Sequence, residues 1–171
     1  MFPLIKNFVD EYKEIKEYLI TNAQITMSTT VDDHFRKVFL LSCASYYEKE
    51  IQGAIKSFVE KKSSDERVLI FATNKGIERQ YHTYFNWKDA NNINSFLGLF
   101  GGDFKNKVSG EIKLDNELEE NMKAFLIIGD ERNKMVHENF LSYNLEKTFD
   151  EISILNDRAI MFIEYLKSKF N

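Results

Sequence analysis

The stretch DERNKMVH, residues 130–137, closes a long run of helical periodicity and decides how the rest of the chain is interpreted. Apolar or small side chains recur through this run at helical spacing, at Leu118, Met122, Phe125, Gly129 and Val136. Arg132 falls inside the last gap of the series, so we expect it on the buried stripe of its helix. A buried guanidinium needs a carboxylate, a phosphate or several other acceptors, so the position of Arg132 requires a partner.

The spacing of Arg132 and His137 adds a geometric constraint. A continuous helix turns by about 100° per residue, so side chains five positions apart point about 140° away from each other. Arg132 and His137 therefore cannot share one face, whereas Asn133 and His137, four apart, can. Two solutions remain open: the helix ends or is distorted between Arg132 and His137, or a second chain completes the site.

The composition predicts one mainly helical domain. The 171 residues include one Pro and seven Gly, and 43% of them are hydrophobic, which suits a single all-α domain over residues 1–171. The net charge of −4 is not typical of a nucleic-acid-binding protein, although an acidic protein can carry a local basic patch. The single Cys fits a reducing compartment. No apolar run reaches the roughly 20 residues that span a bilayer and no signal-peptide pattern is visible, so we expect a cytoplasmic protein without a membrane anchor.

Hydrophobic periodicity places the individual helices. It predicts helices over residues 4–21, 31–62 and 115–137, with a loop at residues 21–30 and a last helix opened by a capping box at Thr148 and Glu151. Residues 67–74 are predicted as a helix, with a buried strand as the alternative. Residues 76–110 combine Gly, Asn and aromatic residues at irregular spacing and predict two or three short helices.

The residues that bind metals or nucleotides in other proteins are scattered here. The three His residues, at positions 34, 82 and 137, stand apart, and neither a paired Cys or His spacing nor a P-loop is present. No metal and no cofactor is therefore expected. We interpret Cys43 as core packing, His82 as a satisfied core or surface residue, and His34 as exposed.

Glu48 borders the buried face of the helix predicted over residues 31–62. A half-buried carboxylate needs a cation, and Arg132 and Arg36 are the candidates. A purely structural ion pair and a supporting role at a functional site both remain open for Glu48.

The surroundings of Arg132 resemble a known family signature. Residues 129–140 (GDERNKMVHENF) resemble the signature of the HEPN superfamily of helical ribonucleases, which is Arg, a polar residue that is usually Asn, a few further residues and then His. Residues 145–152 (LEKTFDEI) are similar to the capped last helix of the RiboL-PSP-like branch of this superfamily. Residues 42–48 (SCASYYE) are similar to another helix of that branch, with Glu48 at its acidic position. Residues 74–101 resemble its middle section less specifically, so the resemblance spans most of the chain.

This resemblance implies a HEPN-like up-down helical bundle, with several short helices inserted in the middle, that cuts RNA without a metal. It implies a homodimer in which the Arg/His motifs of both chains face one composite cleft. His137 would move protons at the 2′-OH or the 5′-oxygen, and Arg132 would hold the scissile phosphate. Asn133 would orient His137 or donate to the phosphate, and Glu48 would set the Arg132 rotamer. The expected product carries a 2′,3′-cyclic phosphate.

The implied biological role is that of a toxin or an antiphage defence effector, partnered by an antitoxin or a regulatory protein. Some HEPN toxins carry Tyr two residues after the His and pair with a nucleotidyltransferase that modifies this Tyr, but Asn139 occupies that position here. Two other functions remain open. One is a non-catalytic HEPN-like module that binds RNA or protein, and the other is a helical dimerisation domain with a structural Arg132–Glu48 pair.

Overall fold

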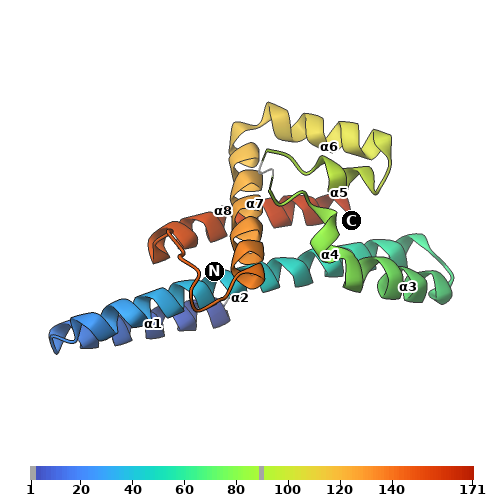
Figure 1. Ribbon diagram of the computed structural model, residues 1–171. Coiled ribbons are helices and arrows are strands. Elements are labelled where there is room, and N and C mark those ends of the chain that lie inside the picture. The colour runs from blue at the N-terminus through green and yellow to red at the C-terminus, as the bar shows by residue number, and fades with distance from the viewer. Residues whose placement is uncertain (1–2, 89–90) are drawn as a thin grey trace.

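One long helix, α7 (Asn116–His137), stands across the other long helices of the computed structural model (Figure 1). The structure describes residues 3–88 and 91–171, with side chains from residue 7 onward, so residues 1–2 and 89–90 of the predicted domain lie outside the described residues. Every regular element in the described ranges is helical, and the expected all-α bundle with short helices in its middle is confirmed. No helix among these residues is long and apolar enough to cross a membrane.

The first two helices, α1 (Pro3–Thr21) and α2 (Ile25–Lys62), form an antiparallel hairpin. The loop predicted at residues 21–30 is wrong, because α2 already begins at Ile25. The hydroxyls of Thr29 and Thr30 donate to the carbonyl oxygens four residues earlier, both at 3.1 Å, so these polar side chains are accommodated inside the helix. A prediction from polar composition alone therefore made the loop too long.

The last helix, α8 (Phe149–Lys169), packs against both α7 and α2. The predicted capping box is confirmed, since the Thr148 side chain accepts from the Glu151 backbone and Glu151 accepts from the Thr148 backbone. The Phe149 ring stacks on Tyr12 and Phe39 at centroid distances of 4.2 and 4.7 Å, which fixes the start of α8 on the α1–α2 hairpin.

The middle of the chain forms short helices, of which α3 and α4 lie against α2 and α6 lies beside α7 (Figure 1). Helix α3 (Glu66–Ala72) continues through a π-helical turn (Thr73–Ile77) into α4 (Glu78–Tyr84), so the helix predicted for residues 67–74 is confirmed and the alternative strand is wrong. Two further helices, α5 (Asn94–Gly98) and α6 (Gly102–Leu114), follow before α7. Short helices were expected here, but α6 is longer than predicted.

Trp87, just after α4, attaches this middle section to α7. A Cβ atom added to Gly129 would lie only 2.0 Å from Cζ3 of the Trp87 ring, so the indole occupies the space that a side chain would need. The Trp87 Nε1–H donates to the carbonyl oxygen of His82 at 3.0 Å. Gly129 therefore allows α4 and its following loop to lie close to the helix that carries Arg132.

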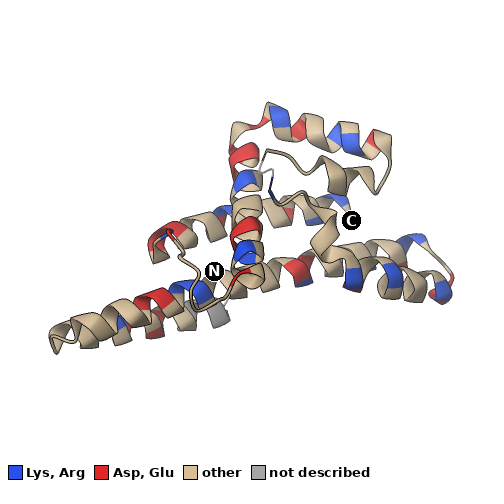
Figure 2. Cartoon of the chain, viewed as in Figure 1, with Lys and Arg blue, Asp and Glu red and all other residues tan. Residues whose placement is uncertain are grey.

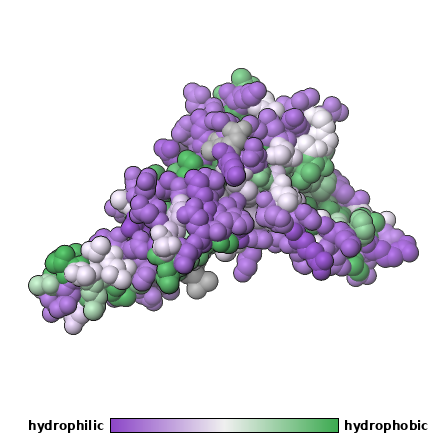
Figure 3. All heavy atoms as spheres, viewed as in Figure 1, coloured by the Kyte–Doolittle hydropathy of each residue, from purple (hydrophilic) through white to green (hydrophobic). Residues whose placement is uncertain are grey.

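The surface mixes charge and apolar patches. Acidic and basic residues alternate along the helices, and none of the described helices is uniformly basic (Figure 2). Apolar surface gathers at the free end of the α1–α2 hairpin (Figure 3), where Tyr18, Ile20, Ile25 and Met27 are exposed.

Candidate active site

Helix α7 carries the three motif residues on its last two turns. It runs without interruption to His137, which is its final residue, and the Glu138 backbone N–H closes the last turn by donating to the Lys134 carbonyl oxygen at 2.9 Å. The interpretation in which the helix ends or is distorted between Arg132 and His137 is therefore wrong. An intact helix places these two side chains about 140° apart. Completion of the site by a second chain stays a prediction.

In the last turn of α7, the buried face lies at Met135 and not at Val136. Val136, which was predicted to be buried, is 52% exposed, whereas the neighbouring Met135 is fully buried. Arg132 is half-buried, so it lies at the border of the buried face and not in the centre of the core. The border position lets the guanidinium reach water and still contact the protein.

Arg132 lines a small pocket together with Glu48, Tyr81, His82 and Asn133. The cavity volume is about 10 Å³, which is room for about one water molecule. Inside it, Nη1 of Arg132 donates to Oδ1 of Asn133 at 2.9 Å. Burial raises the pKa of the Tyr81 hydroxyl far above its ordinary value, with Glu48 adding to this shift and Arg132 opposing it. The polar groups of the pocket are therefore close enough to influence one another electrostatically.

Glu48 does not form the ion pair expected from the sequence. Within the described residues, no carboxylate oxygen of Glu48 lies within the 4.0 Å ion-pair distance of Arg132 or of Arg36. Glu48 instead accepts from Gln52 Nε2 at 3.3 Å, and the same amide donates to the Ile77 carbonyl oxygen at 3.3 Å. Gln52 thus links α2 to the π-helical turn beside the pocket, and Glu48 accepts from the same amide. Its supporting role for Arg132 stays a prediction.

His137 is exposed and lines a second, larger recess next to the pocket. This groove has a cavity volume of about 640 Å³, and its walls are residues 85–88 on one side and Asp130, Asn133, Lys134, His137 and Glu138 on the other. Trp87 and Asn133 line both the pocket and the groove, so the two recesses adjoin. Asn133 therefore lies between the guanidinium of Arg132 and the imidazole of His137.

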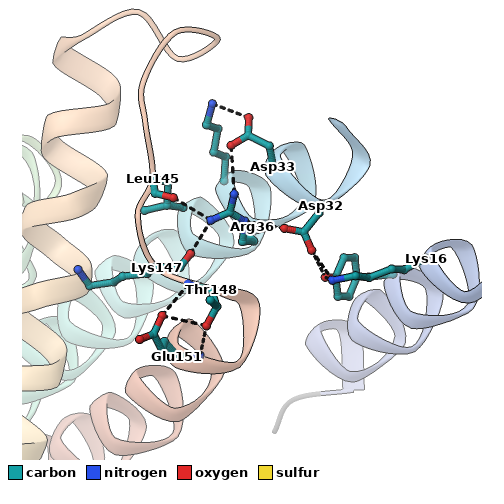
Figure 4. Close-up of polar contacts among 10 residues, drawn as sticks. Lys16, Asp32, Asp33, Arg36, Leu145, Lys147, Thr148 and Glu151 are labelled. Carbon is teal, nitrogen blue, oxygen red and sulfur yellow. Dashed lines mark hydrogen bonds and ion pairs between the residues drawn. The ribbon is translucent and has the colours of Figure 1, made fainter. Parts of the chain in front are cut away.

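The connector that follows His137, residues 138–148, is held by α2. Nη1 of Arg36 donates to the carbonyl oxygens of Leu145 and Lys147 at 2.7 and 2.8 Å (Figure 4). Arg36 also pairs with Asp32 at 3.0 Å, and Lys16 of α1 lies 2.6 Å from the same carboxylate. The three charged side chains therefore tie α1 and α2 to the backbone of the connector.

Lys37 lies beneath the same connector and is almost completely buried, with 1% of its surface exposed. Its ammonium pairs with Asp33 at 2.8 Å and lies 5.8 Å from the centre of the Phe140 ring. A buried ammonium requires such compensation, since an unpaired charge would be strongly disfavoured there.

The connector is also fastened to α7, through Glu131. Tyr143 donates to one oxygen of this carboxylate at 2.7 Å and Lys147 to the other at 3.0 Å. Burial opposes ionisation of Glu131, but these two hydrogen bonds outweigh it and hold the pKa of the carboxyl below its ordinary value. The segment after the motif is thus anchored on both neighbouring helices.

Sequence reasoning missed Tyr81, His82 and Trp87 as members of the site. The available signal was Gly129, three residues before Arg132, since a small residue on an otherwise apolar stripe marks a close approach. That signal could not identify the partner, because the chain contains many aromatic residues between positions 76 and 110. Among the described residues, no cluster of three or more His, Cys, Asp or Glu side chains could hold a metal ion.

The chain matches a known protein family. Residues 6–171 match the family model described as RiboL-PSP-HEPN, which confirms the resemblance inferred from the motif and extends it over almost the whole chain. No curated protein and no solved structure matches the chain.

Proposed function

Because the chain belongs to the RiboL-PSP-HEPN family, we propose that it is a metal-independent endoribonuclease. The family indicates an RNA-related function, and the observation that supports catalysis is the arrangement of Arg132, Asn133 and His137. They place a guanidinium, an amide and an imidazole on the last two turns of one intact helix, bordering two adjoining recesses.

The chemistry requires little from the protein, since RNA carries its own nucleophile in the 2′-OH. The 2′-oxygen attacks phosphorus, the bond to the 5′-oxygen breaks, and the products are a 2′,3′-cyclic phosphate and a 5′-hydroxyl. One group must take the 2′ proton and another must protonate the leaving 5′-oxygen. His137 performs one of these transfers, which is worth about 10²–10⁴-fold in rate.

Arg132 and Asn133 bind the phosphate in this proposal. The Arg132 guanidinium offsets the negative charge that develops on the phosphate oxygens. Since Oδ1 of Asn133 already accepts from Arg132, its Nδ2 remains to donate to the phosphate or to orient His137. Glu48 supports this arrangement from the pocket side.

We further propose a homodimer in which the motifs of two single-domain chains, each spanning residues 1–171, face one cleft. The support is geometric, since one intact helix separates Arg132 and His137 by about 140°. The biological role proposed is that of a cytoplasmic toxin or antiphage effector held in check by an antitoxin or regulatory protein.

The test is cleavage of end-labelled RNA by the purified protein in EDTA, with analysis of the product ends. We expect cyclic phosphate ends, and loss of at least about 10²-fold in rate for His137→Ala with unchanged helical circular dichroism. His34→Ala is the matched control, because His34 is an exposed histidine on α2 outside both recesses. Cleavage that requires a metal, or a fully active His137→Ala variant, would contradict the proposal.

The second candidate is a non-catalytic module that binds RNA or another protein. The net charge of −4 and the alternation of acidic and basic residues favour it over a ribonuclease, because efficient capture of an RNA substrate usually uses a basic surface. It predicts RNA binding without cleavage, weakened by Arg132→Ala and unaffected by His137→Ala. The third candidate, a dimerisation domain with a structural Arg132–Glu48 ion pair, loses its support because that pair is not formed.

A further inference from the structure

Cleavage through the 2′-OH needs two proton-transfer groups, and the family motif supplies one per chain. The base acts at the 2′-oxygen and the acid at the 5′-oxygen, and these atoms lie on opposite sides of the phosphorus in an in-line displacement. A complete site therefore needs a second group across the phosphate from His137.

A second histidine lines the same pocket as Arg132 in the same chain. His82, on the last turn of α4, lines the Arg132 pocket, whereas His137 lines the adjoining groove. The two recesses share Trp87 and Asn133. A phosphate held by Arg132 and Asn133 at this border would have His82 of the same chain on its pocket side and a His137 of the composite cleft on its groove side.

The fold fixes the backbone that carries His82. Its carbonyl oxygen accepts the Trp87 Nε1–H at 3.0 Å, and the Trp87 ring is pressed against Gly129 of α7. Tyr84, also on α4, donates its hydroxyl to the Gly76 carbonyl oxygen at 2.8 Å. The Trp87 contacts hold the end of α4 against the turn of α7 that precedes Arg132, and the Tyr84 hydrogen bond joins α4 to the π-helical turn.

The imidazole of His82 is available for chemistry. The residue is exposed, and among the described residues no hydrogen bond or ion pair engages its ring. The charged or titratable side chains that share its pocket are Glu48, Tyr81 and Arg132. A histidine whose backbone is fixed, whose ring has no hydrogen-bond partner among the described residues and which shares a pocket with Arg132 is suited to proton transfer.

We propose that His82 is the second catalytic residue, which exchanges a proton with one ester oxygen of the phosphate while His137 exchanges a proton with the other. This proposal rests on the ribonuclease function proposed above. It places His82 beside each Arg132, so that a composite cleft between two copies holds His82 from the chain whose Arg132 binds the phosphate and a His137 at the opposite ester oxygen.

The experiment compares His82→Ala and His137→Ala on two RNA substrates, with His34→Ala as the control. The first substrate is ordinary RNA. The second carries a bridging sulfur in place of the 5′-oxygen at the cleavage site, and the thiolate that leaves needs no protonation. On ordinary RNA we expect each variant to lose about 10²–10⁴-fold in kcat with a nearly unchanged KM. On the sulfur substrate, we expect one variant alone to recover, which identifies its histidine as the acid and the other as the base.

Two outcomes would overturn this proposal and leave the ribonuclease function intact. They are full activity of His82→Ala on ordinary RNA and the same response of both variants to the sulfur substrate. Failure of the unmodified protein to cut either substrate would instead refute the ribonuclease function, and this proposal with it.

Discussion

Replacing Gly129 with Ala tests the packing that brings Trp87 and α4 to the site. The added methyl group would lie 2.0 Å from Cζ3 and 2.2 Å from Cε3 of the indole, well inside van der Waals contact. The ring has no easy escape, because it is 9% exposed and packs against Phe85 and Phe125 at centroid distances of 4.8 and 5.7 Å. We therefore expect Gly129→Ala to destabilise the fold.

The size of the effect follows from two opposing contributions. Ala is favoured over Gly in a helix interior by about 1 kcal/mol. Overpacking a core costs about 1–3 kcal/mol and occasionally more, and two contacts near 2 Å correspond to the upper end of that range. The expected net loss is about 2 kcal/mol in the free energy of unfolding, measured by urea titration.

Gly53→Ala in α2 is the matched control, since no heavy atom lies within 4 Å of the added methyl group. This variant should gain up to about 1 kcal/mol, which separates the two substitutions by about 3 kcal/mol. Trp87→Phe should relieve part of the clash with the added methyl group. The double variant Gly129→Ala/Trp87→Phe should therefore lose less free energy of unfolding than the two single variants lose in total. Equal stability of Gly129→Ala and Gly53→Ala would refute the reasoning.

Two further predictions concern the connector after His137. Arg36→Ala removes charged hydrogen bonds to two carbonyl oxygens of the connector and should cost about 3 kcal/mol in the free energy of unfolding, whereas Arg36→Lys should cost less because it keeps the charge. Urea unfolding measures both variants. An unchanged midpoint for Arg36→Ala would contradict the role of Arg36 in holding the connector. The lowered pKa of Glu131 stabilises the fold above the ordinary value of 4.5, and this contribution is lost as the pH falls through the lowered pKa. Glu131→Gln should therefore flatten the decline of the melting temperature below about pH 4.5, and a curve parallel to that of the unmodified protein would contradict it.

Local signals predicted the helix boundaries that depend on neighbouring residues. The side chain of Asp115 accepts from the Leu118 backbone at the start of α7, and Thr148 caps α8, both through contacts only three residues apart. The start of α2 was missed, because the choice between a loop and a back-bonded helix at Thr29 and Thr30 is not fixed by composition.

Tertiary contacts explain what the sequence did not predict about the site. The spacing of Arg132 and His137 predicted their angular separation, because that depends on one helix alone. The absence of the expected Arg132–Glu48 ion pair was not predictable, since the distance between these side chains depends on how two helices cross. His82 was also missed, because it approaches Arg132 only through the contact between Trp87 and Gly129, which joins segments far apart in the chain.

The burial of Lys37 beneath the connector has a practical consequence. An amine with 1% of its surface exposed does not meet an acylating reagent while the connector is in place. Its labelling rate therefore reports how often residues 138–148 lift away from α2, on a scale from local opening to global unfolding. Mass spectrometry of this one acylated lysine would measure the opening rate of the segment that follows His137.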